Sequence, residues 1–266
     1  MKLTSLFRFL LLTQILVLLS SCSSKPTPTP ILTTAEPIST QTKAPDPSPE
    51  PSLTPTATET PIQEEPLYPT PSATLIPAPD YPESHFIQYV HGHKQIYELG
   101  CEASAAVDWA NFFGVSIYEY SLQTSLPLSD NPDFGYVGEV TTDAWGQIPP
   151  YAYGVHAEPI AEALRAYQLP AKAVRNYSIE EVKQKLSENK PIIVWVIGNL
   201  VYSDPVEYVD QQGRVAIVAP YEHVVILTGY NQTHIRYMNN GKFYDAPTEV
   251  FLTSWRVLGY MAVIHE

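Results

Sequence analysis

Positive charge is scarce in this sequence. It holds 15 lysines and arginines against 28 aspartates and glutamates, a formal net charge of −13, and no basic run follows Arg8. Proteins that bind nucleic acid present clustered lysine and arginine to the phosphates. Nucleic acid is therefore not an expected partner, and the acidity otherwise indicates only repulsion of other polyanions.

A long hydrophobic run is also missing. The stretch FLLLTQILVLL, residues 9–19, is shorter than the roughly 20 residues that a membrane-spanning helix needs. It follows Lys2 and Arg8 and precedes small residues, which is the order of a secretory signal peptide over residues 1–21.

The residues that follow the apolar stretch predict how the protein is held. Residues 19–22, LSSC, resemble the bacterial lipobox, which implies cleavage before Cys22 and lipidation of its sulfur. We therefore expect an extracytoplasmic lipoprotein anchored to a bacterial membrane. The alternative is an ordinary signal peptide followed by an unrelated cysteine.

Glycine and aromatic residues are almost absent from residues 23–80. This segment has no glycine and one aromatic residue, Tyr68, and consists mostly of proline, threonine, serine, alanine and glutamate. So little apolar surface cannot offset the entropy lost on ordering, which indicates disorder with polyproline character. We expect a semi-rigid tether over residues 22–80, with a ligand for a proline-binding module as the alternative. The folded domain would span residues 81–266.

Cysteine is also rare in this sequence. The sequence has two, and lipidation of Cys22 would leave Cys101 without a disulfide partner, although exported domains usually pair their cysteines. A lone cysteine is often a small hydrophobic core residue. Cys101, however, begins the nearly apolar segment CEASAAVDWANFF, which predicts a central helix ending near Gly114. The N-terminus of a helix stabilises a thiolate and lowers its pKa, so Cys101 is a candidate nucleophile.

The rest of the domain predicts helices followed by strands, hence an α+β fold. Apolar spacing predicts a helix over residues 158–169, and Ser178 and Glu181 form a capping box that opens another. Short β-branched runs then predict strands, at residues 191–197, 215–219, 223–229, 234–238 and 260–264. Residues 115–154 have the turn residues and aromatics of a long functional loop.

A nucleophilic cysteine needs a base, and His223 is the favoured histidine. It opens the strand HVVILTG, where it can face a cleft from a rigid position. The alternative is a histidine at a strand edge that bonds only to the backbone. Three other histidines are expected elsewhere: one at the start of a helix, one on a surface strand and one at the C-terminus (His156, His234 and His265).

The three remaining histidines, His85, His91 and His93, suggest a zinc site by their proximity. No fourth ligand has suitable spacing. We therefore expect neither a metal nor an organic cofactor.

Two further groups would complete a thiol site. One of the amides in Asn239-Asn240-Gly241 is placed to orient the ring of His223, and we select Asn240, although Asn-Gly is also a hairpin turn. Gln95, six residues before Cys101, can donate its side-chain amide to an oxyanion together with the Cys101 N–H.

The order of glutamine, cysteine at a helix start, histidine and asparagine resembles that of papain-like cysteine peptidases. The stretches GCEASAAVDWANFFGV, SIEEVKQKLSENKPIIVWV and HVVILTGYNQTHIRYMNNG resemble more closely the stand-alone relatives of bacteriocin-leader-processing peptidases, the C39-like peptidases. The resemblance covers about residues 85–265. It implies a papain-like fold in which the helix that carries the nucleophile packs on an antiparallel sheet.

The resemblance also implies roles for the site residues: Cys101 as nucleophile, His223 as general base and Gln95 in the oxyanion hole. Asn240 stands where the family usually has aspartate, and Glu102 follows the cysteine where glycine is usual. We therefore expect a monomeric cysteine peptidase that hydrolyses peptide bonds of a peptide or protein through a thioester. The alternatives are an acyltransferase of the transglutaminase type and a catalytically idle surface-binding module.

Overall fold

The computed structural model describes residues 80–266. The predicted signal peptide, Cys22 and nearly all of the predicted tether lie outside the described residues. None of the helices in this described part combines the length and apolarity needed to cross a membrane.

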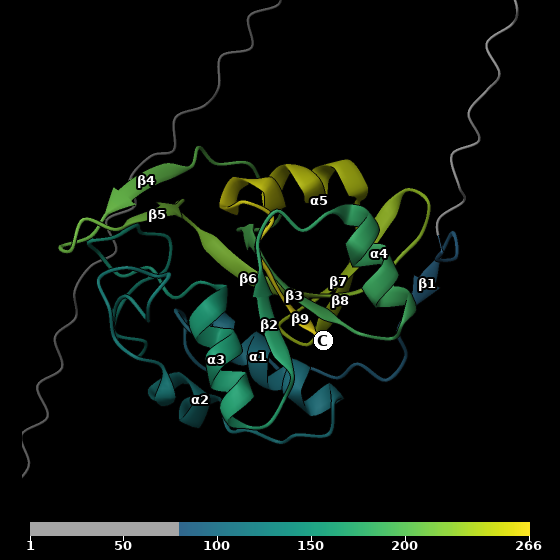
Figure 1. Cartoon of the computed structure of the whole chain (residues 1–266), viewed down its shortest axis with the longest axis horizontal. Helices are drawn as coiled ribbons and strands as arrows, with labels where there is room; N and C mark the ends of the chain where they lie inside the picture. The colour runs from purple at the N-terminus through teal and green to yellow at the C-terminus, as the bar shows by residue number, and fades with distance from the viewer. Residues whose placement is uncertain (1–79) are drawn as a thin grey trace, which may run out of the picture. The chain divides into compact units, whose positions relative to one another are not determined.

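One antiparallel sheet organises the described chain (Figure 1). Its strand order is β2-β9-β3-β6-β7-β8, and β1 pairs with the far end of β6. The strands of this sheet are β1 (His85–Phe86), β2 (Ala171–Val174), β3 (Ile192–Ile197), β6 (Glu222–Tyr230), β7 (His234–Asn239), β8 (Lys242–Pro247) and β9 (Ala262–His265). A separate hairpin consists of β4 (Val206–Val209) and β5 (Val215–Val218).

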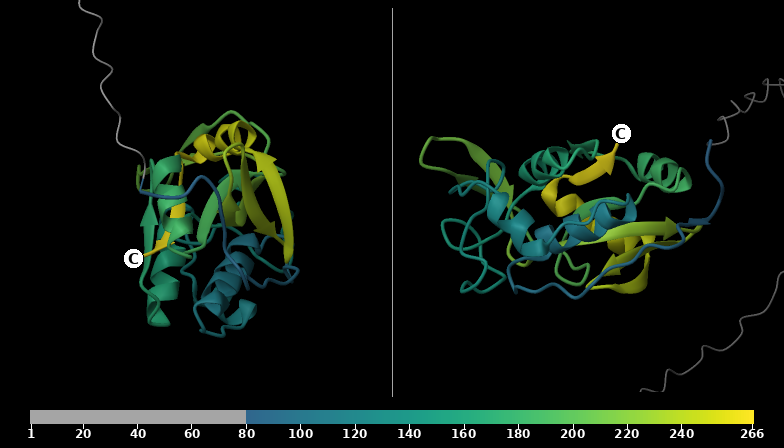
Figure 2. Two further views of the ribbon diagram at one scale, coloured as in Figure 1. Left: turned by 90° about the vertical axis from the view of Figure 1, so that its right-hand side faces the viewer. Right: turned by 90° about the horizontal axis from the view of Figure 1, so that it is seen from below.

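Five α-helices surround the sheet (Figure 2). They are α1 (Cys101–Phe112), α2 (Glu119–Ser125), α3 (Ala157–Ala166), α4 (Ile179–Ser187) and α5 (Thr248–Trp255), followed by a 3₁₀ turn (Arg256–Leu258). Helix α1 packs against β6 and β3, α3 against β2 and β9, and α5 against β3, β7 and β8. The sheet therefore has helices on both faces, which explains why all six residues of β3 are buried.

Helix α1 is central because small residues let it approach the sheet. Every residue from Cys101 to Ala110 is buried, and most are alanine or another small residue. Trp109 anchors the helix at its far end, where its indole Nε1–H donates to the Pro191 carbonyl at 2.8 Å. This contact lies next to the start of β3, so the helix and the strand hold each other in register.

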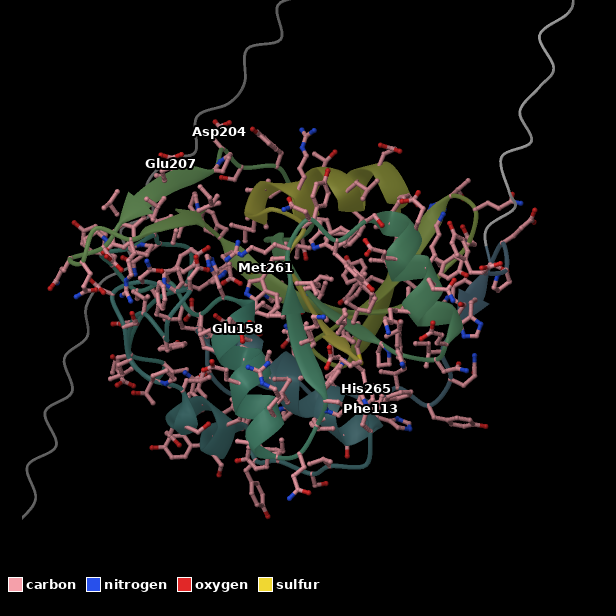
Figure 3. The ribbon with its side chains drawn as sticks, in the orientation of Figure 1. Phe113, Glu158, Asp204, Glu207, Met261 and His265 are labelled. Atoms are coloured by element: carbon pink, nitrogen blue, oxygen red, sulfur yellow. The ribbon has the colours of Figure 1, made fainter. Side chains whose placement is uncertain are left out.

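The main predicted elements are confirmed. The structure has an α+β fold, helices begin at Cys101 and after Ser178, and the capping box of Ser178 and Glu181 forms. The sequence analysis did not predict β2, β4 and β8 or the short helices α2 and α5, whose few residues carry no clear periodicity. His265, expected at a C-terminus that frays, is instead the last residue of β9, and its ring stacks on Phe113 with centroids 4.2 Å apart (Figure 3).

A two-residue turn joins β7 to β8. Asn239 pairs with Lys242 as the last rung of the ladder, and Asn240 and Gly241 have φ angles of 51° and 70°. Two consecutive positive φ angles are typical of a type I′ hairpin turn. The Asn-Gly turn of the sequence analysis is therefore confirmed, and it separates two adjacent asparagines into a strand residue and a turn residue.

Candidate active site

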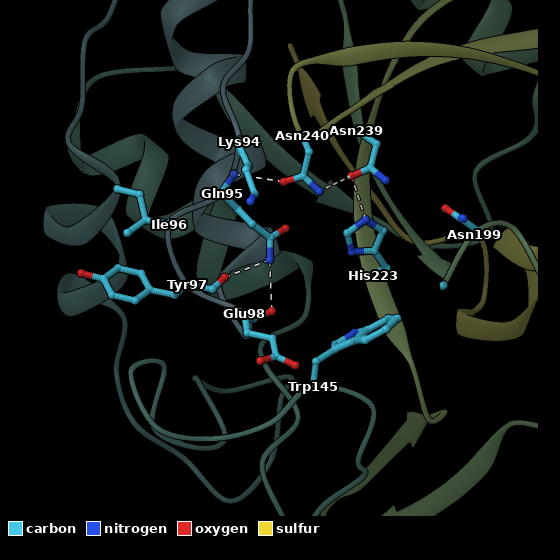
Figure 4. A pocket seen from close by; sticks show the side chains of 11 residues that line it. Lys94, Gln95, Ile96, Tyr97, Glu98, Trp145, Asn199, His223, Asn239 and Asn240 are labelled. Atoms are coloured by element: carbon cyan, nitrogen blue, oxygen red, sulfur yellow. Dashed lines mark hydrogen bonds between the residues drawn. The ribbon is translucent and has the colours of Figure 1, made fainter. Parts of the chain in front are cut away.

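His223 lies in a cleft of about 660 Å³ on the surface of the domain (Figure 4). One wall is the loop that leads into α1, residues 94–98, and the other includes Trp145, Asn199 and the end of β7. Strand β6 positions His223 through antiparallel pairing with β3, where His223 stands opposite Val196. The imidazole is thus held on a buried strand with one side open to the cleft.

The ring of His223 is oriented by Asn239. Nε2 of His223 lies 3.0 Å from Oδ1 of Asn239, which also accepts a hydrogen bond from Nδ2 of Asn240 at 3.1 Å. An amide oxygen only accepts, so Nε2 carries the hydrogen and Nδ1 is left as the basic nitrogen. Burial lowers the pKa of His223, and the bond to Asn239 opposes this shift only in part.

The expected bond between Asn240 and His223 is not formed. The turn conformation points the side chain of Asn240 toward the other wall of the cleft, where its Oδ1 accepts the backbone N–H of Gln95 at 3.0 Å. The residue bonded to the ring is therefore Asn239, the amide that the sequence analysis did not select. Sequence alone places the two amides side by side, and only the backbone geometry of the turn separates them.

Gln95 also differs from expectation. Its side-chain Nε2 donates to the carbonyls of Tyr97 and Glu98, at 2.9 and 3.0 Å. Both amide hydrogens are used, so in this conformation Gln95 shapes the loop and has no donor left for an oxyanion. The Cys101 N–H, among the first four of α1, has no acceptor within its helix.

Cys101 begins α1 but is buried at 5% exposure, outside the cleft lining. It borders a smaller gap that Gln95, Asn239 and Asn240 also line. The backbone N–H of Val224 lies near Sγ and lowers the pKa of the thiol, and both residues line this gap, so the thiol lies beside the strand that carries His223. Among the described side chains, the thiol donates to Oε2 of Glu102 at 3.3 Å, and no bond joins it to the imidazole.

The environment of the thiol contradicts the expected low pKa. Burial raises the pKa of Cys101 well above its ordinary value, and the nearby carboxyl groups of Glu102 and Glu222 raise it further. Burial thus raises the pKa of Cys101 and lowers that of His223, and both shifts favour the neutral form of the group.

Trp145 is a site residue that the sequence analysis did not name. Its indole Nε1–H donates to the Glu222 carbonyl at 2.6 Å, its ring meets Tyr221 edge-on at 5.1 Å, and it lies 6.2 Å from the ring of His223. The indication available in the sequence was its place in the long loop over residues 115–154. Trp145 forms a rigid apolar wall beside the imidazole.

Three other histidines, His85, His93 and His156, bond to side chains outside the cleft. His85 bonds to Asn189, and buried His156 bonds to Asp133, so the latter neither caps α3 through its side chain nor faces the cleft. The ring of His85 bonds to Asn189, whereas the ring of His93 contacts Asp108 and Glu119. The two rings therefore do not converge on a zinc site. Among the described residues, one cluster of three side chains, Cys101, Glu102 and Glu222, brings atoms that can bind a metal ion within 4.8 Å of one another.

His93 fixes the loop that forms one wall of the cleft. Its Nδ1 contacts Asp108 at 2.6 Å and its Nε2 contacts Glu119 at 2.7 Å. Burial alone would lower the pKa of His93, but the hydrogen bonds and charges of the two carboxylates outweigh it and raise the pKa. Burial raises the pKa of Asp108 as well. We take the ring as the titrating member because both of its nitrogens must carry hydrogens to donate to both carboxylates.

Comparison with known proteins identifies the family. The sequence profile of the Peptidase_C39-like family matches residues 85–263. The chain belongs to this family. It is therefore a cysteine-type peptidase, a hydrolase of the papain-like α+β fold. No curated protein sequence matches the chain.

One solved structure shares the fold. A protein from Bacillus anthracis assigned to the C39-like peptidases has a TM-score of 0.61 at 21% identity, covering 70% of this chain and 98% of its own. The peptidase domain of Streptococcus ComA has a TM-score of 0.40 at 13% identity, covering 66% and 98%. Xylellain, a cysteine protease from Xylella fastidiosa, has a TM-score of 0.41 at 12% identity, covering 70% and 86%. The last two similarities are too distant to support an argument.

The first prediction concerns the pH dependence of stability. His93 has a folded-state pKa above its ordinary value, so its contribution is complete below about pH 6.5 and is lost as the pH rises through the raised pKa. We expect the Tm of the wild-type protein to fall over this range and the fall to be a few degrees smaller in His93→Gln, which lacks the His93 contribution. Thermal unfolding followed by circular dichroism at a series of pH values measures it. His234→Gln is the control and should keep the step; a step of the same size in His93→Gln would contradict the assignment.

The second prediction concerns the space beside Glu102. A Cβ at Gly154, which has a φ of 117°, would overlap Oε1 of Glu102. Gly154→Ala should therefore lower the free energy of unfolding by on the order of 2 kcal/mol or more. Gly213→Ala is the matched control, because its φ is also positive, at 79°, but nothing lies within 4 Å of the added Cβ. Urea denaturation measures both variants. Equal losses of unfolding free energy would show that backbone strain at a positive φ, and not overlap with Glu102, causes the loss.

Proposed function

We propose that this family member is a lipid-anchored, extracytoplasmic cysteine peptidase in which Cys101 is the nucleophile, His223 the general base and Asn239 the residue that orients the ring. The supporting observation is the His223–Asn239 hydrogen bond at the cleft, with Cys101 at the start of α1 beside Val224, the residue that follows His223 on β6. A cysteine at a helix start, an imidazole with one free nitrogen and an amide behind it are the parts of a thiol acyl-transfer site.

The reaction begins with a proton transfer. The thiol turns from Glu102 toward the cleft, and Nδ1 of His223 takes its proton because Nε2 is held by Asn239. The thiolate then attacks the peptide carbonyl, and a carbon–sulfur bond forms as the carbonyl oxygen becomes an oxyanion. The Cys101 N–H lies at the helix start, where it can donate to that oxygen. Gln95 would contribute only if it released one of its loop carbonyls.

The remaining steps return the site to its starting state. The imidazolium gives its proton to the leaving amine, the carbon–nitrogen bond breaks, and the acyl group stays on sulfur as a thioester. His223 then removes a proton from water as the hydroxide attacks the thioester, and the carbon–sulfur bond breaks. The imidazolium returns that proton to sulfur, and the carboxylic acid product loses its proton to solvent and leaves. Peptide or protein chains are the substrate class, and Trp145 and Ile96 offer apolar contacts in the cleft.

Lipidation at Cys22 would place this domain outside the cytoplasm on a tether. The support is the order of basic residues, apolar run and LSSC in residues 1–22. A tether of several dozen residues lets the domain act at a distance from the bilayer.

The third prediction tests the two asparagines. Asn239→Ala should lower kcat by about tenfold or more with little change in stability, because the ring of His223 loses its orienting acceptor. Asn240→Gly should keep nearly full kcat, because glycine accepts the positive φ of the turn. The assay follows release of new amino termini from a peptide library, with Cys101→Ala as the inactive control. Full activity in Asn239→Ala together with inactivity in Asn240→Gly would restore the original assignment. Transfer of the acyl group to added amines, in preference to water, would favour the acyltransferase.

The fourth prediction concerns the anchor. The full-length protein produced in a bacterium should sediment with membranes, and Cys22→Ala should be neither lipidated nor processed by the lipoprotein route. Metabolic labelling with a fatty-acid analogue measures the modification, and Cys101→Ala is the matched control that should label normally. An unlabelled wild-type chain recovered in the soluble fraction would contradict the prediction.

A further inference from the structure

Two glutamates are buried together against the thiol of Cys101. Glu102 is 1% exposed and Glu222 2% exposed, and acidic atoms of the three residues all lie within 4.8 Å of one another. Glu102 follows Cys101 in the first turn of α1, and Glu222 precedes His223 on β6. The pair therefore joins the two elements that carry the proposed nucleophile and base.

The hydrogen bonds of the pair are uneven. Glu102 accepts the Val155 N–H at Oε1, 2.7 Å away, and the Cys101 thiol at Oε2, 3.3 Å away. Neither oxygen of Glu222 has a hydrogen-bond partner, although both are buried. A buried carboxylate without donors is strongly disfavoured, so a proton is the simplest way to satisfy this side chain.

Nothing in the surrounding described structure neutralises a double negative charge. Neither glutamate forms an ion pair with a cation, and the hydroxyls of Tyr136 and Tyr153 bond elsewhere, to the Leu99 carbonyl and to His156. The ring of His223 bonds to Asn239. Burial raises the pKa of Glu102 to about 7, and burial together with the charge of Glu102 raises the pKa of Glu222. The carboxyl groups thus hold protons at pH values where exposed glutamates have lost them.

The pocket is shaped to keep the carboxyl groups together. Gly154 passes so close that a Cβ there would overlap Glu102 and would lie 3.4 Å from Oε2 of Glu222. Only a residue without a side chain permits this approach. The backbone at Gly154 thus lies directly against both carboxyl groups.

We propose that Glu102 and Glu222 form a proton-sharing pair, here termed the carboxyl pair, that positions the Cys101 thiol and controls its ionisation. This role rests on the proposed function of Cys101 as nucleophile. With its protons in place, the pair is uncharged or singly charged and can donate an O–H to the thiolate. Once the pair has lost its protons, two negative charges face the sulfur and oppose thiolate formation.

The charge of the pair therefore limits the peptidase on the alkaline side. The proton that leaves Cys101 goes to Nδ1 of His223, and the pair supplies no proton to the substrate. Glu102 and Glu222 are positioning residues in this scheme. Loss of either charge should make the thiol more acidic, which is opposite to the effect of removing a general base.

The test is the pH dependence of thiol alkylation in the full chain. Iodoacetamide modification of Cys101, read by mass spectrometry of the peptide that contains it, gives the pH midpoint of thiolate formation without any turnover. We expect the midpoint to move down by about one to three pH units in both Glu102→Gln and Glu222→Gln. Because the two groups share protons, the double variant should shift less than the sum of the single ones. Glu249→Gln, an exposed carboxylate on α5, is the control and should leave the midpoint unchanged.

The outcomes separate this proposal from the proposed function. Unchanged midpoints in folded variants overturn the carboxyl pair, even if the protein cleaves peptides. Shifted midpoints in a protein that cleaves no peptide support the pair and reject the peptidase assignment.

If the variants fail to fold, a second measurement on the wild-type protein tests the proposal. Its infrared spectrum should contain the band of a protonated carboxyl group at about pH 7, since an exposed glutamate is ionised there. Loss of that band as the pH rises toward 9, in step with loss of alkylation reactivity relative to a free thiol, supports the proposal. Absence of the band at about pH 7 overturns it.

Discussion

The close contact between α1 and β6 is the constraint on which the site depends. Ten consecutive buried residues, most of them small, press the helix against the strand, so its first residue comes to rest beside the Val224 N–H. The same contact buries Glu102 against Glu222. A helix with larger side chains on this face would stand farther from the sheet. The thiol would then lie away from β6, and the two carboxyl groups would not meet. The small residues of α1 thus set the surroundings of the Cys101 thiol.

Burial favours the neutral forms of both Cys101 and His223. Burial raises the pKa of Cys101 and lowers that of His223, so a thiol and a neutral imidazole are favoured over an ion pair. Activation then requires the thiol to exchange Glu102 for the imidazole as its acceptor. In the proposed mechanism, a thiol held in this way stays buried until a substrate enters the cleft.

Polar contacts hold the two walls of the cleft together. Asn240 of the β7–β8 turn accepts the Gln95 N–H, and His93 joins the same loop to α1 and α2 through Asp108 and Glu119. These contacts link the segment before the cysteine to the strand behind the histidine. The cleft therefore has a wall built from loop residues, but one that is fixed at both ends.

Local patterns in the sequence determined the parts of the site. The helix beginning at Cys101, the strand of His223, the capping box at Ser178 and the Asn-Gly turn all depend on residues near one another in the chain, so periodicity and capping rules predict them. The short elements β2, β4 and α2 were missed because a few residues carry too little periodicity.

Only the tertiary structure decided how the parts work together. The turn backbone selected Asn239 over Asn240, the loop carbonyls took both donors of Gln95, and Glu222 reached a thiol 121 residues before it in the chain. These outcomes depend on contacts between distant segments and on burial, which changes the charge of a group without changing its identity. For that reason the sequence indicated a thiol of low pKa, whereas in the folded protein burial and two nearby carboxyl groups raise the pKa of that thiol.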